Sequence, residues 1–379
     1  MKVEIGSSPP SSNGEPFAAS PRLHLAFIDG IRALAALFVV LCHSYYEPSN
    51  GFFEAAWINH LGLAYGHLAV DVFIVTSGFC LMLSIARRDD VFGSFASYMK
   101  RRARRILPPY YAALGFSILF MFAGANEITG TVWDNSLPLT WQGVVAHVLL
   151  IDDLPLPHLG GAINYPLWSI PVEFQLYLFL PVIVWGIARF GNVPTLLAAC
   201  AAGVAVHLAA PSLDPANPWY LGLFAFGAVA ARQVVRGKVT VHYRNAAVAI
   251  ALPLAAMLIF SGKRFFDGHL PLIDLLTGAV TALGIAATCL DLDTRKLALT
   301  RVLTWKPLVA LGGFSYSLYL VHAPLLHALN LGLRKFFQLS PVASCGVLVC
   351  CIPAIAGVAY LFHRVFERPF MSSTAKGEA

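Results

Sequence analysis

Charged residues are scarce in this chain of 379 residues. Lysine, arginine, aspartate and glutamate together make up 12% of the sequence, about half the share that is typical of soluble domains. Hydrophobic residues make up 58%, which excludes a soluble enzyme and a disordered chain. Apolar runs of nearly twenty residues recur from about residue 26 onward. The sequence therefore predicts an all-α, polytopic integral membrane protein.

The chain also lacks cysteine pairs with the spacing of a metal site or a disulfide. All seven cysteines lie inside apolar runs, where cysteine usually packs as a small apolar residue. We therefore expect no metal, and a secreted disulfide scaffold is excluded. The net charge of +6 is modest, and no stretch interleaves basic residues with an aromatic stacking platform, so no nucleic-acid partner is expected.

The apolar runs predict about ten membrane spans, each long enough to cross a bilayer core of about 30 Å. One further run, Trp141–Ile151, is too short to cross and is expected to be re-entrant or interfacial. Residues 1–22 and 371–379 are polar and predicted to be disordered tails, and the first has no signal-peptide pattern. Residues 23–370 then form one transmembrane domain without an internal repeat. The spans are expected at about 26–46, 66–86, 107–124, 167–188, 194–210, 219–235, 245–261, 270–290, 308–330 and 341–363.

The distribution of basic residues orients these spans. With the N-terminus in the cytoplasm, 22 of the 26 lysines and arginines fall in cytoplasmic segments and 4 in outer loops, as the positive-inside rule expects. If Trp141–Ile151 were a full span, the later basic clusters would lie outside. The sequence therefore predicts that both termini are cytoplasmic.

Ionisable side chains inside the spans are candidates for function, because each costs a few kcal/mol in a bilayer unless it is paired or hydrated. Arg32 and His43 of the first span are eleven residues apart. They therefore share one helix face and lie about 16 Å apart in depth, with Arg32 on the cytoplasmic side. Taken singly, an interfacial histidine and a snorkelling arginine paired with Asp29 would explain them without a function.

Two carboxylates are predicted at a depth similar to that of the histidine. Asp71 lies near the outer end of the second span, where pairing with His67 is the simplest alternative to a function. Glu173 lies in the fourth span, about 9 Å below the outer boundary. Near mid-membrane, Ser77 is followed by Gly78, where a glycine permits close approach of another helix or of a thin ligand.

Arginines gather on the cytoplasmic side. Arg102 and Arg105 lie on one face of a helix that enters the membrane, and two guanidinium groups there suit bidentate phosphate binding. Contact with anionic lipid is the plain alternative. The candidate site thus has a base and carboxylates on one side and cations on the other. Acyl-coenzyme A, with a polyanionic head and a thin arm, has a matching shape.

Six motifs follow one another over nearly the whole chain. They are Ile28-Asp-Gly-Ile-Arg-Ala-Leu-Ala through His43, Val70–Phe79, Arg102-x-x-Arg105-Ile-x-Pro108, Leu167–Glu173, Phe314–His322 and Glu367–Phe370. In this order they resemble membrane acyltransferase family 3. The resemblance implies a membrane O-acyltransferase that moves an acyl group, typically acetyl, from cytoplasmic acyl-CoA to a hydroxyl of a carbohydrate or glycolipid acceptor in a bacterial inner membrane. Some members carry a fused periplasmic hydrolase-like domain, which is expected to be absent here.

A mechanism follows as a hypothesis. His43 acts as general base on the acceptor hydroxyl, or forms a transient acyl-histidine, and Asp71 or Glu173 orients its ring. Besides the acceptor and the lipid bilayer, a homo-oligomeric partner stays open. The residues assigned to the acyl-CoA donor are Arg32, Arg102, Arg105, Ser77 and Gly78, and those assigned to the acceptor are Trp168, Tyr316, Tyr319 and His322.

Two other classes of protein would use intramembrane polar residues. A transporter or flippase of a polar or lipid-linked glycan would line its path with them, although no inverted repeat is visible. A structural partner in a polysaccharide machine would not depend on them at all. Labelled acyl transfer distinguishes the three, because only the enzyme changes the acceptor covalently.

Overall fold

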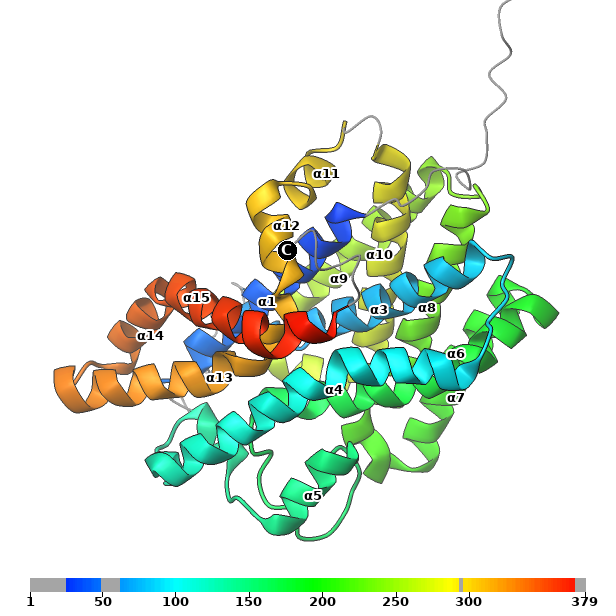
Figure 1. Cartoon of the computed structure of the whole chain (residues 1–379). Helices are drawn as coiled ribbons and strands as arrows, with labels where there is room; N and C mark the ends of the chain where they lie inside the picture. Colours follow the sequence, from blue (N-terminus) through cyan, green and yellow to red (C-terminus); the bar gives the residue numbers. More distant parts are fainter. Residues whose placement is uncertain (1–24, 49–61, 293–295, 372–379) are drawn as a thin grey trace, which may run out of the picture.

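The computed structural model describes residues 25–48, 62–292 and 296–371, and every regular element in these ranges is helical (Figure 1). The prediction of an all-α fold is confirmed. Both predicted tails, apart from Met371, lie outside the described residues. The helices are α1 (Ala26–Tyr46), α3 (Leu68–Ala86), α4 (Phe95–Phe120), α5 (Trp141–Leu149), α6 (Ser169–Phe190), α7 (Asn192–Ala209), α8 (Tyr220–Val235), α9 (Val241–Gly268), α10 (Leu270–Asp291), α11 (Ala298–Leu303), α12 (Lys306–Gly313), α13 (Ser315–Gly332), α14 (Pro341–Cys350) and α15 (Ile352–Phe362).

The described helices include seven that are long and apolar enough to cross a membrane, namely α1, α3, α4, α6, α7, α9 and α10. Two bent pairs bring the number to nine: α12 with α13, bent by 73°, and α14 with α15, bent by 51°. The polytopic prediction is confirmed, although the count of about ten spans is not fully met. The sixth predicted span is α8, which has 16 residues and a length of about 24 Å. Because most of α8 is buried against other helices, it need not match the thickness of the lipid.

The run Trp141–Ile151 forms α5, a helix of nine residues. It begins where the Thr140 side chain accepts a hydrogen bond from the Gly143 amide, at 3.0 Å, and it ends at Leu150, which has a left-handed backbone (φ 58°). A helix of this length spans about 14 Å, so the prediction that this run does not cross a bilayer agrees with the structure. The cytoplasmic location of the two termini stays a prediction.

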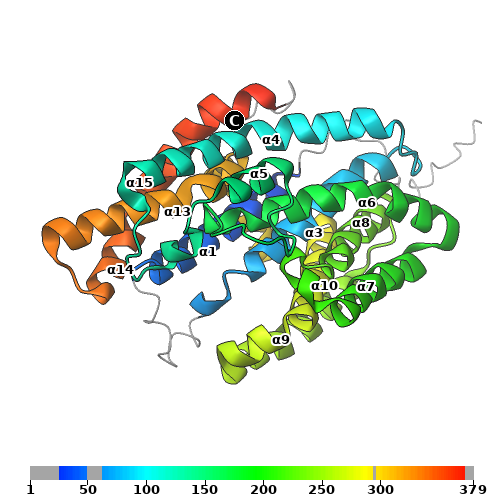
Figure 2. The ribbon, with the colours of Figure 1, turned by 90° about the horizontal axis from the view of Figure 1, so that it is seen from below.

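Helix α1 lies in the middle of the bundle (Figure 2). On one side it contacts α3, which in turn packs against α8 and α10, and on the other it contacts α12 and α13. The helices α7, α8 and α10 form one flank, whereas α13, α14 and α15 form the other. The first span therefore carries its arginine and its histidine along the junction between the two flanks.

Helices α3 and α8 come into close contact through two glycines. A Cβ atom on Gly78 would overlap the carbonyl oxygen of Phe224, and one on Gly227 would overlap that of Val75. Glycine thus permits the two backbones to touch, as small residues often do between membrane helices.

The substitution Gly78→Ala is expected to destabilise the protein, because the new methyl group meets main-chain atoms of α8 and one helix must move. The cost should be about 1–3 kcal/mol, seen as a lower midpoint of thermal unfolding in detergent. Gly115→Ala is a suitable control, because a Cβ atom there meets nothing within 4 Å. An unchanged midpoint for Gly78→Ala would contradict the close packing of α3 on α8.

Candidate active site

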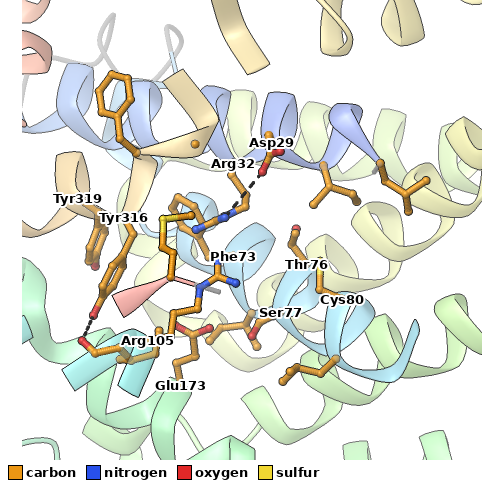
Figure 3. Close-up of a pocket in the computed structure, with 18 of the residues that line it drawn as sticks. Asp29, Arg32, Phe73, Thr76, Ser77, Cys80, Arg105, Glu173, Tyr316 and Tyr319 are labelled. Atoms are coloured by element: carbon orange, nitrogen blue, oxygen red, sulfur yellow. Dashed lines mark hydrogen bonds and ion pairs between the residues drawn. The ribbon is translucent and has the colours of Figure 1, made fainter. Parts of the chain in front are cut away.

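A cavity of about 1240 Å³ lies among α1, α3, α4, α6 and α13 (Figure 3). It is larger than most pockets for small ligands, which occupy about 300–1,000 Å³. Seven of the twelve residues that the sequence predicts for the site line this cavity, so α1, α3, α4, α6 and α13 bring together side chains that lie far apart in the chain. They are Arg32, Ser77, Arg102, Arg105, Glu173, Tyr316 and Tyr319.

Three guanidinium groups from two helices meet in the cavity. Arg105 of α4 lies close enough to Arg32 of α1 and to Arg102 for their charges to repel one another. Arg32 is paired with Asp29 at 3.8 Å, as the sequence suggested, and both side chains keep about a fifth of their surface exposed. The buried Nε of Arg102 has no hydrogen-bond partner among the described residues. Converging arginines with unused donors are suited to an anion that carries several phosphate oxygens.

Glu173 lies in the same cavity as the arginines. Its Oε1 accepts a hydrogen bond of 2.6 Å from the Tyr177 hydroxyl, one helical turn later. That hydroxyl accepts a second bond, of 3.4 Å, from Ser77. The sequence did not single out Tyr177, although its spacing of four residues from Glu173 is the signal that would have suggested it. Glu173 therefore joins α6 to α3 in the wall of the cavity.

His43 is hydrogen-bonded to another histidine. Its Nδ1 lies 2.7 Å from Nε2 of His322 on α13, and the two rings are stacked with centroids 5.0 Å apart. The edge of Tyr165 also contacts His43, with ring centroids 5.0 Å apart. The expectation that Asp71 or Glu173 orients the ring is not met, because the structure gives this position to His322.

The hydrogen bonds assign a tautomer to each ring of the neutral pair. Nδ1 of His322 lies 2.7 Å from the carbonyl oxygen of Tyr319 and 3.2 Å from that of Leu318. A carbonyl oxygen can only accept, so Nδ1 of His322 carries the proton and its Nε2 is an acceptor. Nδ1 of His43 must then donate to it. This leaves Nε2 of His43 as the unprotonated nitrogen, which is the atom that a general base needs.

The histidine pair lies behind the end of the cavity. Tyr319 lines the cavity, and its ring is 5.8 Å from that of His322. The Tyr319 hydroxyl is fixed by Ser169, at 2.8 Å, and by the carbonyl oxygen of Pro166, at 2.6 Å. Phe73 of α3 packs against Tyr319 with ring centroids 5.9 Å apart. Two rings, those of Tyr319 and His322, therefore separate the end of the cavity from His43.

Three predicted site residues lie elsewhere. Gly78 does not line the cavity and contacts the backbone of α8, so the structure shows a packing role and its assignment to donor binding stays a prediction. Trp168 does not line the cavity but stacks on His67, with ring centroids 5.4 Å apart. Asp71 is fully buried beside Asp274 of α10 rather than next to His43. The alternative, a pairing of Asp71 with His67, is not met either, because Nε2 of His67 is hydrogen-bonded to Asp274 at 3.1 Å.

The fold and the cavity define a class of protein: an integral membrane protein with an arginine-lined cavity that ends near a pair of hydrogen-bonded histidines. The acyltransferase domain of family 3 matches residues 25–364. The chain belongs to this family, which confirms the resemblance seen in the motifs, and it is a membrane acyltransferase.

Relatives of the chain occur in several bacteria. Acyltransferase MdmB of Streptomyces mycarofaciens is 27% identical over 93% of this chain and 93% of its own length. The putative peptidoglycan O-acetyltransferase YrhL of Bacillus subtilis is 26% identical over 79% of this chain, and the peptidoglycan O-acetyltransferase OatA of Listeria monocytogenes is 22% identical over 80%. The chain spans about half the length of the last two, 48% and 50%. No solved structure matches the chain significantly.

Proposed function

We propose that this protein is an O-acyltransferase that moves an acyl group, most simply acetyl, from cytoplasmic acyl-CoA to a hydroxyl of a carbohydrate or glycolipid acceptor. One observation carries the proposal. Three arginines line a cavity in the same membrane domain as His43, a histidine whose Nε2 is unprotonated. The name of the Listeria relative supports O-acetylation of a glycan. The excess of basic residues in the predicted cytoplasmic segments supports an orientation with the arginines on the inner side of the membrane, which in this proposal is the cytoplasmic membrane.

In this proposal the arginines hold the donor. Arg102 and Arg105 bind phosphates of coenzyme A, and Arg32 binds either its diphosphate or the thin arm that carries the acyl group. The arm then extends along the cavity toward Phe73 and Tyr319, over a depth of about 16 Å. The Tyr319 ring, which lies between the cavity and the histidine pair, must turn aside for the thioester to come close to His43.

The chemistry is the transfer of an acyl group from sulfur to oxygen. Nε2 of His43 takes the proton of the acceptor hydroxyl as its oxygen attacks the thioester carbonyl, and a tetrahedral intermediate forms. When the C–S bond breaks, the leaving thiolate takes the proton from His43, so that ester and free coenzyme A are the products. Throughout, Nδ1 of His43 donates to His322, which holds the charged ring in place.

Transfer of labelled acetyl from acetyl-CoA to glycan, measured in membranes that contain the protein, tests the proposal. Label that appears in an ester on the acceptor supports it. Movement of an unmodified glycan across the membrane without any ester would instead favour the flippase. A label that remains on His43 after acid quenching, found by mass spectrometry, would favour the acyl-histidine route over general-base catalysis.

Arginine replacements should affect the donor selectively. Arg105→Ala is expected to raise KM for acyl-CoA by about tenfold or more, because a charge-assisted hydrogen bond is worth about 1.5–3 kcal/mol. Arg104→Ala is the matched control: this neighbour is exposed and does not line the cavity. The measurement is KM at constant acceptor concentration. Equal effects of the two replacements would indicate a general role of the basic segment, such as lipid contact.

The thiol of Cys80 offers a binding test that does not depend on turnover. It lines the cavity near the three arginines. Acyl-CoA is expected to slow its alkylation in a variant whose other six cysteines are replaced, because the bound donor fills the space next to the thiol. Free phosphate at the same concentration should protect less. Undiminished alkylation at saturating acyl-CoA would contradict donor binding in this cavity.

A further inference from the structure

At the N-terminal end of α3, His67 and Asp71 lie beside Asp274 of α10. Each of the three side chains offers one ligand atom, and these atoms lie within 4.8 Å of one another. None of the three lines the cavity that we assign to the donor. The cluster is therefore separate from the proposed acyl-transfer site, and a role for these three residues does not depend on that function.

The two carboxylates of the cluster have few of the partners that buried charges need. Both have 0% exposed surface. Both oxygens of Asp71 and Oδ1 of Asp274 are without a hydrogen bond among the described residues, and no ion pair joins either carboxylate to a described lysine or arginine. Asp274 has His67 and Trp219 beside it, and Asp71 has the Tyr220 hydroxyl. Two adjacent carboxylate charges with so few partners in an apolar helical bundle are strongly unfavourable. Either protons or a bound cation must compensate them.

The contacts around His67 hold a nitrogen and a carboxylate oxygen close to the separation of two metal ligands. Nε2 of His67 and Oδ2 of Asp274 are hydrogen-bonded at 3.1 Å. They need to move apart slightly to bind one tetrahedral ion, because ligands with bonds of about 2.0–2.2 Å are separated by roughly 3.3–3.5 Å. The indole Nε1 of Trp219 donates to the same Asp274 oxygen at 2.8 Å, in the manner of groups that orient metal ligands.

Other contacts hold the histidine and leave it reachable. Its ring stacks on Trp168, with centroids 5.4 Å apart, and the Tyr220 hydroxyl lies 2.9 Å from its Nε2. That hydroxyl also lies beside Asp71. The His67 side chain is 22% exposed, whereas Asp274 is fully buried. An ion from the aqueous side would therefore meet the histidine first and then the two carboxylates.

We propose that His67, Asp71 and Asp274 bind a divalent metal ion and that this ion joins α3 to α10. One imidazole nitrogen with two carboxylates is a ligand set that suits Zn²⁺, whereas Mg²⁺ and Ca²⁺ prefer oxygen ligands alone. Three protein ligands leave a fourth position for water. The sequence predicted no metal from its cysteine pattern, and the third ligand, Asp274, is 207 residues from His67, so local spacing could not have indicated the site.

The test is the metal content of the full-length protein in detergent, measured by mass spectrometry after equilibration with Zn²⁺ and gel filtration. The wild type is expected to retain about one ion per chain and to unfold at a lower temperature after chelation. Asp71→Asn and Asp274→Asn should retain none. Asp214→Asn is the matched control, because Asp214 pairs with His207 at 2.7 Å outside the cluster and its loss should not change the metal content.

Each other outcome overturns the proposal. The wild type could retain no metal and unfold at the same temperature with Zn²⁺ as with chelator. This result would mean that protons, and not a metal ion, compensate the two carboxylates. Metal retained by both cluster variants would mean an adventitious ion only. If the variants fail to fold, Co²⁺ is added to the wild-type protein instead. The visible absorption of four-coordinate Co²⁺ is then expected, and its absence would contradict the site.

Discussion

Replacement of His43 by alanine is expected to abolish acyl transfer almost completely. General-base catalysis contributes about 10²–10⁴-fold to a rate, so kcat should fall by that factor. KM for acyl-CoA should stay close to the wild-type value, because His43 does not line the cavity that holds the arginines. The effect then falls on the chemical step rather than on donor binding.

The measurement is the rate of label transfer from acetyl-CoA in purified membranes, with protein amounts matched. His207→Ala is a suitable control, because His207, like His43, lies in an apolar helix, but it is bonded to Asp214 at 2.7 Å and does not line the cavity. Added imidazole should restore part of the activity of His43→Ala, since a free base can enter the space of the lost ring. A wild-type rate for His43→Ala would remove the residue from the mechanism.

Much of the fold could be predicted from the sequence because membrane spans obey a local rule. A helix in lipid needs about twenty apolar residues, and this can be read from a short window without knowledge of the rest of the chain. The same length rule correctly set Trp141–Ile151 apart from the spans. It failed at α8, which is short because other protein helices, and not lipid, surround it.

The arginines of the candidate site could also be predicted from local spacing. Arg102 and Arg105 share a helix face because they are three residues apart, and both line the cavity. The contacts between histidines and distant residues could not be predicted in this way. His43 and His322 are 279 positions apart, and in the separate cluster His67 and Asp274 are 207 positions apart. Which side chains meet across helices depends on the rotation and depth of each helix, and periodicity within one span does not contain this information.

Gly78 illustrates the same limit. A glycine near mid-membrane was compatible with either a ligand or a neighbouring helix, and the contact with the helix becomes visible only through the position of the Phe224 carbonyl. Asp71 was assigned to His43 because the two share a depth, but depth does not specify direction. The side chain lies toward α10, where a second carboxylate meets it.

His322 provides the second large prediction, because it fixes the tautomer of His43. The two backbone carbonyls that bind its Nδ1 leave its Nε2 as an acceptor. His322→Ala removes that acceptor, so the His43 ring loses its orientation and can place its proton on Nε2. We expect kcat to fall by about 10²-fold. Loss of a group that orients a ligand typically costs about 10–100-fold, and loss of the carboxylate of a catalytic triad costs about 10⁴-fold. KM for acyl-CoA should not change.

The conservative variant distinguishes orientation from packing. In His322→Gln the side-chain oxygen can accept the bond from Nδ1 of His43, so we expect the rate to return to within about tenfold of the wild type. Ring ¹⁵N shifts should report a proton on Nδ1 of His43 in the wild type and in His322→Gln, and a mixture of tautomers in His322→Ala. If both variants fold and lose the same activity with unchanged shifts, His322 merely fills space. If His322→Gln alone recovers, a neutral histidine performs the task that a carboxylate has in hydrolase triads, and this arrangement suits a bilayer because it adds no charge to the site.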